Sequence, residues 1–78
     1  MKKELRAPLY RQGDVVNFWF SNGRKEWLCR GMVCVVDIFR NGEQITEVEY
    51  DIESYDHALP QEKCIYKHIK EKEIVGRA

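Results

Sequence analysis

The sequence predicts an all-β domain in which five short strands follow one another as a meander, with a short 3₁₀ turn before the last strand. Three observations indicate this fold. Runs rich in Val, Ile, Phe, Trp and Tyr are separated by short polar stretches, a pattern typical of β-strands. Asn-Gly pairs at 22–23 and 41–42 are strong hairpin signals. The strand pairings implied by these two turns also agree on a single core face.

The composition excludes several classes of protein. A length of 78 residues supports one domain, and a hydrophobic fraction of 44% is too high for a disordered tail. The 13 basic and 13 acidic side chains cancel, which argues against a general polyphosphate binder. No apolar run approaches the roughly 20 residues of a membrane helix, and none follows the charged N-terminus. We therefore expect a cytoplasmic protein with no membrane partner.

The strands are expected within residues 13–75, between an N-terminal arm at 1–12 and a tail at 76–78. Pro8 blocks a long helix in the arm. Gly13 opens a first strand at 15–20, and a long second strand at 26–39 has Gly31 in its middle. The later elements are a third strand at 44–52, a polar loop at 53–62, a fourth strand at 64–67, a turn or 3₁₀ segment at 68–70 and a closing strand at 71–75.

Two-residue turns at both Asn-Gly pairs would fix which residues lie opposite one another. The first turn places Phe18 opposite Trp27, and the second places Val33 opposite Tyr50. Since alternate residues of a strand share a face, both pairings select the same face of the middle strand. The expected core residues on that face are Val16, Phe18, Trp27, Cys29, Val33, Val35, Val48, Tyr50 and Ile52.

The opposite face of the predicted sheet carries an apolar strip edged by carboxylates. The strip consists of Leu28, Met32, Cys34, Val36, Ile38 and Ile45. One interpretation is burial within the chain, because the middle strand bends at Gly31 or because the N-terminal arm covers the strip. The other is a contact surface for a protein partner or for a second copy of the chain.

Charge is segregated along the chain. Residues 1–40 hold eight basic and four acidic side chains, whereas residues 41–62 hold seven acidic and no basic ones. Glu47, Glu49 and Asp51 alternate, so they form one column on a strand face. This column is either a solvated face that resists aggregation or an acidic docking strip for a basic partner.

No catalytic or metal-binding pattern stands out. Ser21 and Ser54 lack the sequence context of an activated nucleophile. The odd number of cysteines, Cys29, Cys34 and Cys64, fits reduced thiols better than a disulfide framework. They form no CxxC motif, and Cys29 and Cys34 are five apart on one predicted strand and so point to opposite faces, which argues against a zinc site. We therefore expect no enzyme activity, no metal and no cofactor.

Several segments resemble those of SH3-like small barrels. Gly13-Asp14-x-Val16 resembles the entry of KOW-type and Tudor-type members, and residues 30–33 resemble their second strand. Residues 48–52 and 66–74 are similar to segments of small phage and mobile-element proteins. The resemblance covers residues 12–75 and implies a five-stranded barrel that binds a partner. Tudor-type barrels enclose methylated side chains in an aromatic cage. Here Trp27 and Tyr50 are expected in the core, so only Trp19 and Tyr55 remain as candidate cage residues.

Three functions follow as expectations. The first is a non-catalytic interaction module, such as a phage or mobile-element accessory or inhibitor protein, that binds another protein through Trp19, Met32, Val36, Glu47, Glu49, Asp51 and Tyr55. The second is a KOW-like barrel that binds nucleic acid through Arg11, Trp19, Arg24, Lys25 and Arg30. The third is a structural subunit that forms a homodimer through the apolar strip.

Overall fold

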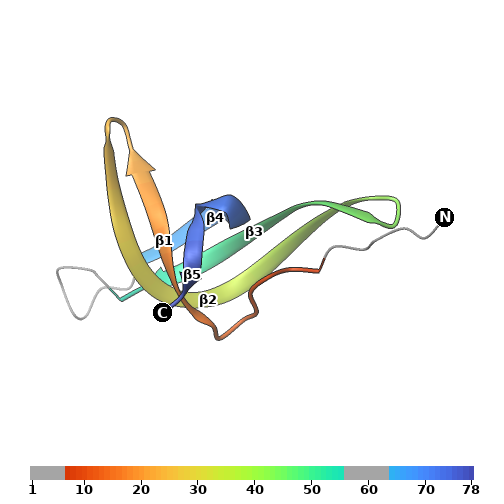
Figure 1. The fold of residues 1–78 in the computed structure, drawn as a ribbon, viewed down its shortest axis with the longest axis horizontal. Coiled ribbons are helices and arrows are strands. Elements are labelled where there is room, and N and C mark those ends of the chain that lie inside the picture. The colour runs from red at the N-terminus through yellow and green to blue at the C-terminus, as the bar shows by residue number, and fades with distance from the viewer. Residues whose placement is uncertain (1–6, 56–63) are drawn as a thin grey trace.

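A computed structural model describes residues 7–55 and 64–78 and places them in one antiparallel sheet (Figure 1). The elements are β1 (Val15–Asn22), β2 (Lys25–Asn41), β3 (Gln44–Ser54), β4 (Cys64–Lys70), the 3₁₀ helix η1 (Glu71–Glu73) and β5 (Ile74–Arg77). The order across the sheet is β4-β3-β2-β1-β5, so β4 and β5 are edge strands that do not pair with each other in the described residues. The all-β class, the five strands and the 3₁₀ turn before the last strand are confirmed.

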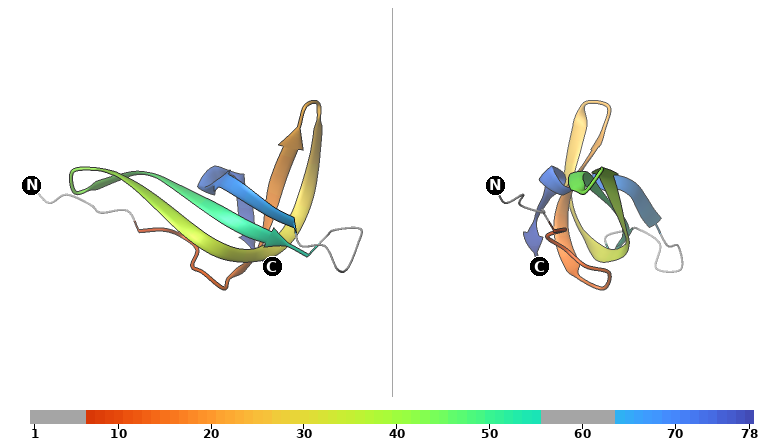
Figure 2. Two further views of the ribbon diagram at one scale, coloured as in Figure 1. Left: turned by 180° about the vertical axis from the view of Figure 1, so that it is seen from behind. Right: turned by 90° about the vertical axis from the view of Figure 1, so that its right-hand side faces the viewer.

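Strand β2 connects the two halves of the sheet. Its first half pairs with β1 and its second half with β3, and Gly31 is paired with both Val16 of β1 and Ser54 of β3. The strand curves strongly, so the β1–β2 hairpin and the β2–β3 hairpin project in different directions (Figures 1 and 2). Buried residues from all five strands and from the N-terminal arm pack together on the inner face of this curve.

Both hairpin turns are two residues long, as expected, but each lies one residue later than predicted. The turns are Gly23-Arg24 and Gly42-Glu43, because Asn22 pairs with Lys25 and Asn41 pairs with Gln44. Each glycine has φ +65° and no other residue of either turn has a positive φ, which is the pattern of a type II′ turn with glycine in the first position. The sequence predicts Asn and Gly at the two central positions instead, as in a type I′ turn.

The later turns shift the predicted partners of Phe18 and Val33 by two residues. Phe18 pairs with Cys29 and Val33 pairs with Ile52, so the predicted pairings of Phe18 with Trp27 and of Val33 with Tyr50 are wrong. A shift of two residues leaves every side chain on the same face, because side chains alternate with a period of two. The prediction of the faces therefore holds over most of the sheet, although the register was wrong.

Two of the nine predicted core residues, Trp27 and Val35, are exposed. The other seven are buried, together with Tyr10, Ile69 and Ile74. A bulge at Cys34 changes the alternation of β2, so Val35 turns outward and Val36 packs against the core. Trp27 keeps the predicted face but lies toward the end of the projecting hairpin, where its ring stacks on Phe20 at a centroid distance of 6.0 Å.

The predicted turn at 68–70 is part of β4, and the 3₁₀ helix begins at Glu71. The closing strand therefore begins at Ile74, later than the predicted 71–75, and extends to Arg77, into the predicted tail at 76–78. The irregularity expected at 68–70 is a bulge between Tyr66 and Ile69, where two residues of β4 lie opposite one of β3. His68 has φ +60°, and it is the one residue other than glycine with a positive φ in the described part of the chain. Its backbone N–H donates to Asp51 Oδ1 at 3.1 Å, which fixes the bulge to β3.

The N-terminal arm packs on the core instead of the outer apolar strip. In residues 7–12 of the arm, Tyr10 is buried and its ring meets Tyr50 edge to face at 5.7 Å. Leu9, the other large apolar residue there, is exposed. Residues 1–6, and residues 56–63 of the predicted polar loop, lie outside the described part of the chain.

Replacing Gly23 with alanine is expected to lower the free energy of unfolding by about 1–2 kcal/mol, because a side chain at positive φ is strained. Gly76→Ala is the matched control, since a Cβ at Gly76 meets no heavy atom within 4 Å and its φ is ordinary. Urea unfolding followed by tryptophan fluorescence measures both. Equal stability of the two variants would contradict the assignment of the turn.

Candidate functional site

The outer face of the sheet, opposite the core, combines exposed apolar side chains with carboxylates. Its apolar members are Trp19, Leu28, Met32, Val35, Phe39 and Ile65, and its carboxylates are Asp37, Glu47, Glu49, Asp51 and Glu53. Across β2 and β3 the two kinds lie opposite each other: Met32 pairs with Glu53, Val35 with Asp51 and Phe39 with Glu47. All of these apolar residues except the half-buried Met32 are exposed. We call this set the outer face.

One pair on the outer face joins two carboxylates. Asp37 on β2 lies directly opposite Glu49 on β3, with Asp51 two residues further along. Like charges directly opposite each other destabilise a sheet. The partners of these carboxylates come from β4: His68 Nδ1 lies 3.1 Å from Glu49 Oε1, and Lys70 Nζ lies 3.0 Å from Glu47 Oε1. Hydrogen bonding to Glu47, and then its negative charge, raise the pKa of Lys70 above its ordinary value.

Three side chains on the outer face have the donors and the spacing to hold a metal ion. Asp37, Asp51 and His68 each offer one ligand atom, and these atoms lie within 4.8 Å of one another. Two carboxylate oxygens and an imidazole nitrogen would suit a divalent transition metal. Exposed acidic groups at such spacing are common without an ion, so we assign no metal function to them.

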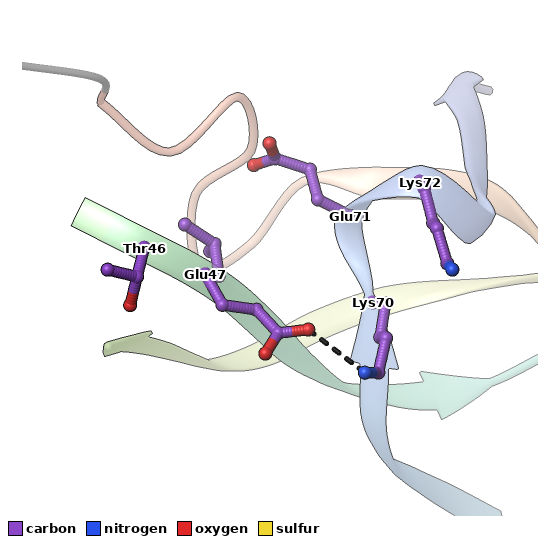
Figure 3. Close-up of a pocket in the computed structure, with 6 residues that line it drawn as sticks. Thr46, Glu47, Lys70, Glu71 and Lys72 are labelled. Carbon is purple, nitrogen blue, oxygen red and sulfur yellow. Dashed lines mark ion pairs between the residues drawn. The ribbon is translucent and has the colours of Figure 1, made fainter. Parts of the chain in front are cut away.

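A shallow pocket of about 230 Å³ lies where β3 meets β4 and η1 (Figure 3). Its charged lining is Glu47, Lys70, Glu71 and Lys72. Figure 3 shows Glu47 and Lys70 paired with each other, while the carboxylate of Glu71 turns away from Lys72. Glu71 instead accepts hydrogen bonds from the Leu9 N–H and the Tyr50 hydroxyl. The pocket therefore combines an ion pair with a buried structural carboxylate.

Most of the predicted protein-binding residues lie on the outer face. Trp19 is exposed there, and Met32, Glu47, Glu49 and Asp51 are half-buried. Tyr55 is exposed just after β3, and its backbone N–H donates to the Arg30 carbonyl at 2.8 Å.

Three positions of the apolar and acidic strip need correction. The sequence predicts Val36, Ile38 and Ile45 on the outer face, but Val36 and Ile45 pack against the core, and Ile38 pairs with the core residue Val48 while its side chain stays exposed. Val35, Phe39 and Asp37 occupy the outer face instead and were missed as site residues. The bulge at Cys34 explains all of the changes on β2, and a second bulge at Thr46 accounts for Ile45. Neither bulge has a signal in the alternation of the sequence.

The predicted nucleic-acid residues are spread over the first hairpin and the segment before it, and Arg30, which pairs with Asn17, lies on the same face as Trp19 and two residues from its partner Leu28. Arg24 and Lys25 are at the tip of the first hairpin, whereas Arg30 is five residues beyond Lys25 on β2, about 17 Å along an extended strand. Arg11 precedes β1, and its backbone N–H donates to the Asp14 carboxylate at 2.9 Å.

The cysteines that the structure describes lie in two different environments. Cys29 is a buried member of the core, whereas Cys34 is half-buried with its thiol 4.0 Å from Glu53 Oε2. The side chain of Cys64 lies outside the described part of the chain.

Comparison with known protein families, with curated proteins and with solved structures gives no match for this chain. Within the described residues, no helix is both long and apolar enough to cross a membrane.

Proposed function

We propose that this protein is a non-catalytic module that binds a basic segment of another protein through its outer face. The observation that carries the proposal is the direct opposition of Asp37 and Glu49, beside Asp51, on a face that also exposes apolar side chains. A sheet gains nothing in stability from such a pair. Locally destabilising arrangements such as this like-charge pair are expected where a surface serves binding. Lysine or arginine side chains of a partner would neutralise these carboxylates.

The apolar members of the outer face also favour a protein partner. Val35 and Phe39 are exposed on either side of Asp37 and point to the same side of β2. Contiguous exposed apolar residues rimmed by polar ones commonly mark protein contact sites. A partner that alternates basic and apolar side chains would match the alternation of carboxylate and apolar groups on this face.

The proposal includes an SH3-like barrel as the scaffold. What supports it is the meander order with β5 beside β1, the strong curve of β2 (Figure 1) and the 3₁₀ helix between the two edge strands. Homodimerisation through the same face has weaker support. In a two-fold interface the same patch meets itself, so the carboxylate-rich surfaces of two copies would repel each other.

The expected result is that a basic amphipathic peptide binds and that removing the opposed charges weakens binding while it stabilises the fold. The probe is a fluorescein-labelled peptide of sequence KVKLKVKL, and EVELEVEL is its acidic counterpart. Asp37→Asn combined with Glu49→Gln should weaken anisotropy-measured binding of the basic peptide about tenfold, a loss of about 1.4 kcal/mol. The same variant should unfold at higher urea, because opposed like charges are removed.

Glu43→Gln combined with Glu73→Gln is the matched control, because it removes the same charge away from the opposed pair. That control should bind the basic peptide as the unchanged protein does. Equal affinity for the basic and acidic peptides, or equal weakening by both double variants, would refute binding at the outer face.

A further inference from the structure

We propose a second binding site, away from the carboxylates of the outer face, in which an aromatic pocket on the first hairpin stacks a base of single-stranded nucleic acid. The pocket has a volume of about 320 Å³ and is lined by Phe20, Asn22, Trp27, Leu28, Cys29 and Tyr66. Five of these residues come from β1 and β2 of the hairpin that projects from the rest of the sheet (Figure 1), and Tyr66 comes from β4.

Three aromatic rings shape this pocket. Phe20 is the central ring, and it lies 6.0 Å from Trp27 with an interplanar angle of 21° and 4.4 Å from Tyr66 with an angle of 42°. Phe20 and Tyr66 are half-buried against the core, which holds them in place. Trp27 is 43% exposed, so its ring still offers surface to a ligand. A flat, partly buried aromatic platform of this kind is the usual means of binding an unpaired base.

Polar and charged groups at the rim favour a nucleic acid over a protein. Asn22, at the mouth, carries an amide that can both donate to and accept from the edge of a base. Lys25 lies directly opposite Asn22 on the same face, and Arg24 is next to it in the turn. None of the six lining residues is acidic. A stacked base would therefore have its phosphates beside two cations, whereas a basic protein segment would be repelled there.

The pocket also distinguishes single strands from duplexes. A base can stack on these rings only if it is unstacked from its neighbours, which is costly in a duplex. The proposed contacts are to the base and the phosphates and not to the ribose 2′-hydroxyl. Single-stranded DNA and RNA are therefore both expected to bind.

Two tryptophans give this proposal a matched pair of variants. Trp19 and Trp27 are each 43% exposed on the same hairpin, but Trp19 pairs with Leu28 on the outer face and Trp27 pairs with Phe20 on the inner face. Fluorescein-labelled dT10 and rU10 are the probes, titrated in low salt. Trp27→Ala should weaken binding at least about fivefold, and Trp19→Ala should leave it unchanged.

The basic rim predicts a second effect. Replacing Lys25 with glutamine should weaken binding and reduce the slope of log affinity against log salt by about 0.7, as for one lost phosphate contact to a single strand. Arg40→Gln, near the tip of the second hairpin, is the control and should leave the slope unchanged.

A fluorescence measurement tests the same site without the Trp27→Ala variant, in case that variant fails to fold. In Trp19→Phe the remaining tryptophan is Trp27, and saturating dT10 or rU10 should quench its emission. In Trp27→Phe the emission of Trp19 should not change. Quenching by either oligonucleotide in the first variant supports the site. No binding of either probe, quenching confined to Trp19, or equal affinity for a ten-base-pair duplex would overturn it. None of these readouts involves Asp37 or Glu49, so the test is independent of the outer-face proposal.

Discussion

Replacing Gly31 with alanine is expected to destabilise the protein by about 3 kcal/mol or more, the upper range for forced overpacking in a protein interior. A Cβ at this position would collide with the backbone carbonyl oxygen of Glu53 and would lie 2.9 Å from both the Glu53 carbonyl carbon and Ile52 Cγ2. Gly31 is buried and pairs with β1 on one side and β3 on the other. Because the main obstacle is backbone within the same sheet, it cannot rotate away as a side chain could.

The effect of Gly31→Ala should be large relative to the whole stability of the domain. A fold of this size has few kcal/mol to lose, so a substantial unfolded fraction is expected near room temperature. Urea unfolding and far-UV circular dichroism measure this, with Gly76→Ala as the control at an uncrowded glycine. If Gly31→Ala were as stable as the control, β2 and β3 could not approach each other as closely as the structure places them.

The order of the strands along the chain was well predicted, because turns and strand starts are marked by a few neighbouring residues. The two Asn-Gly pairs marked both hairpins, and Gly13 marked the start of β1 at Val15. Side-chain alternation then assigned the faces of Phe18, Cys29 and Tyr50 correctly. The choice between type I′ and type II′ turns moved the register by two residues, to which a pattern of period two is insensitive.

The candidate sites depended on features that alternation cannot reveal. Because of the bulge at Cys34, Val35 lies on the outer face where Val36 was expected. No residue in that segment indicates a bulge. Trp27 was assigned to the core because its face is the core face, but the core ends before the hairpin does. The first error hid part of the outer face, and the second hid the aromatic pocket. The alternation of side chains does not show where a strand bulges or how far along a hairpin the core reaches.

A buried polar network ties the N-terminal arm to the core and supports the last prediction. The hydroxyl of Tyr50 donates to Glu71 Oε2 at 2.6 Å, the short distance of a charge-assisted bond, and accepts from the Tyr10 N–H at 3.4 Å. Leu9 N–H also donates to Glu71 Oε2, at 3.1 Å. Arg77 completes the attachment, since it donates to the Leu9 carbonyl at 2.8 Å and lies over the Tyr10 ring.

Tyr50→Phe is expected to lower the free energy of unfolding by about 2–3 kcal/mol, because it removes the hydroxyl from a buried carboxylate and leaves the Tyr10 N–H without its acceptor. Tyr55→Phe is the matched control and should change stability little, since Tyr55 is exposed. Hydrogen exchange gives a more specific test than urea unfolding. The amides of Leu9 and Tyr10 should exchange faster in Tyr50→Phe relative to those of β2 and β3, because the arm loses its anchor before the sheet opens. Uniformly faster exchange throughout the sheet, with no preference for the arm, would mean that Tyr50 stabilises the core through packing alone and that the arm is held by other contacts.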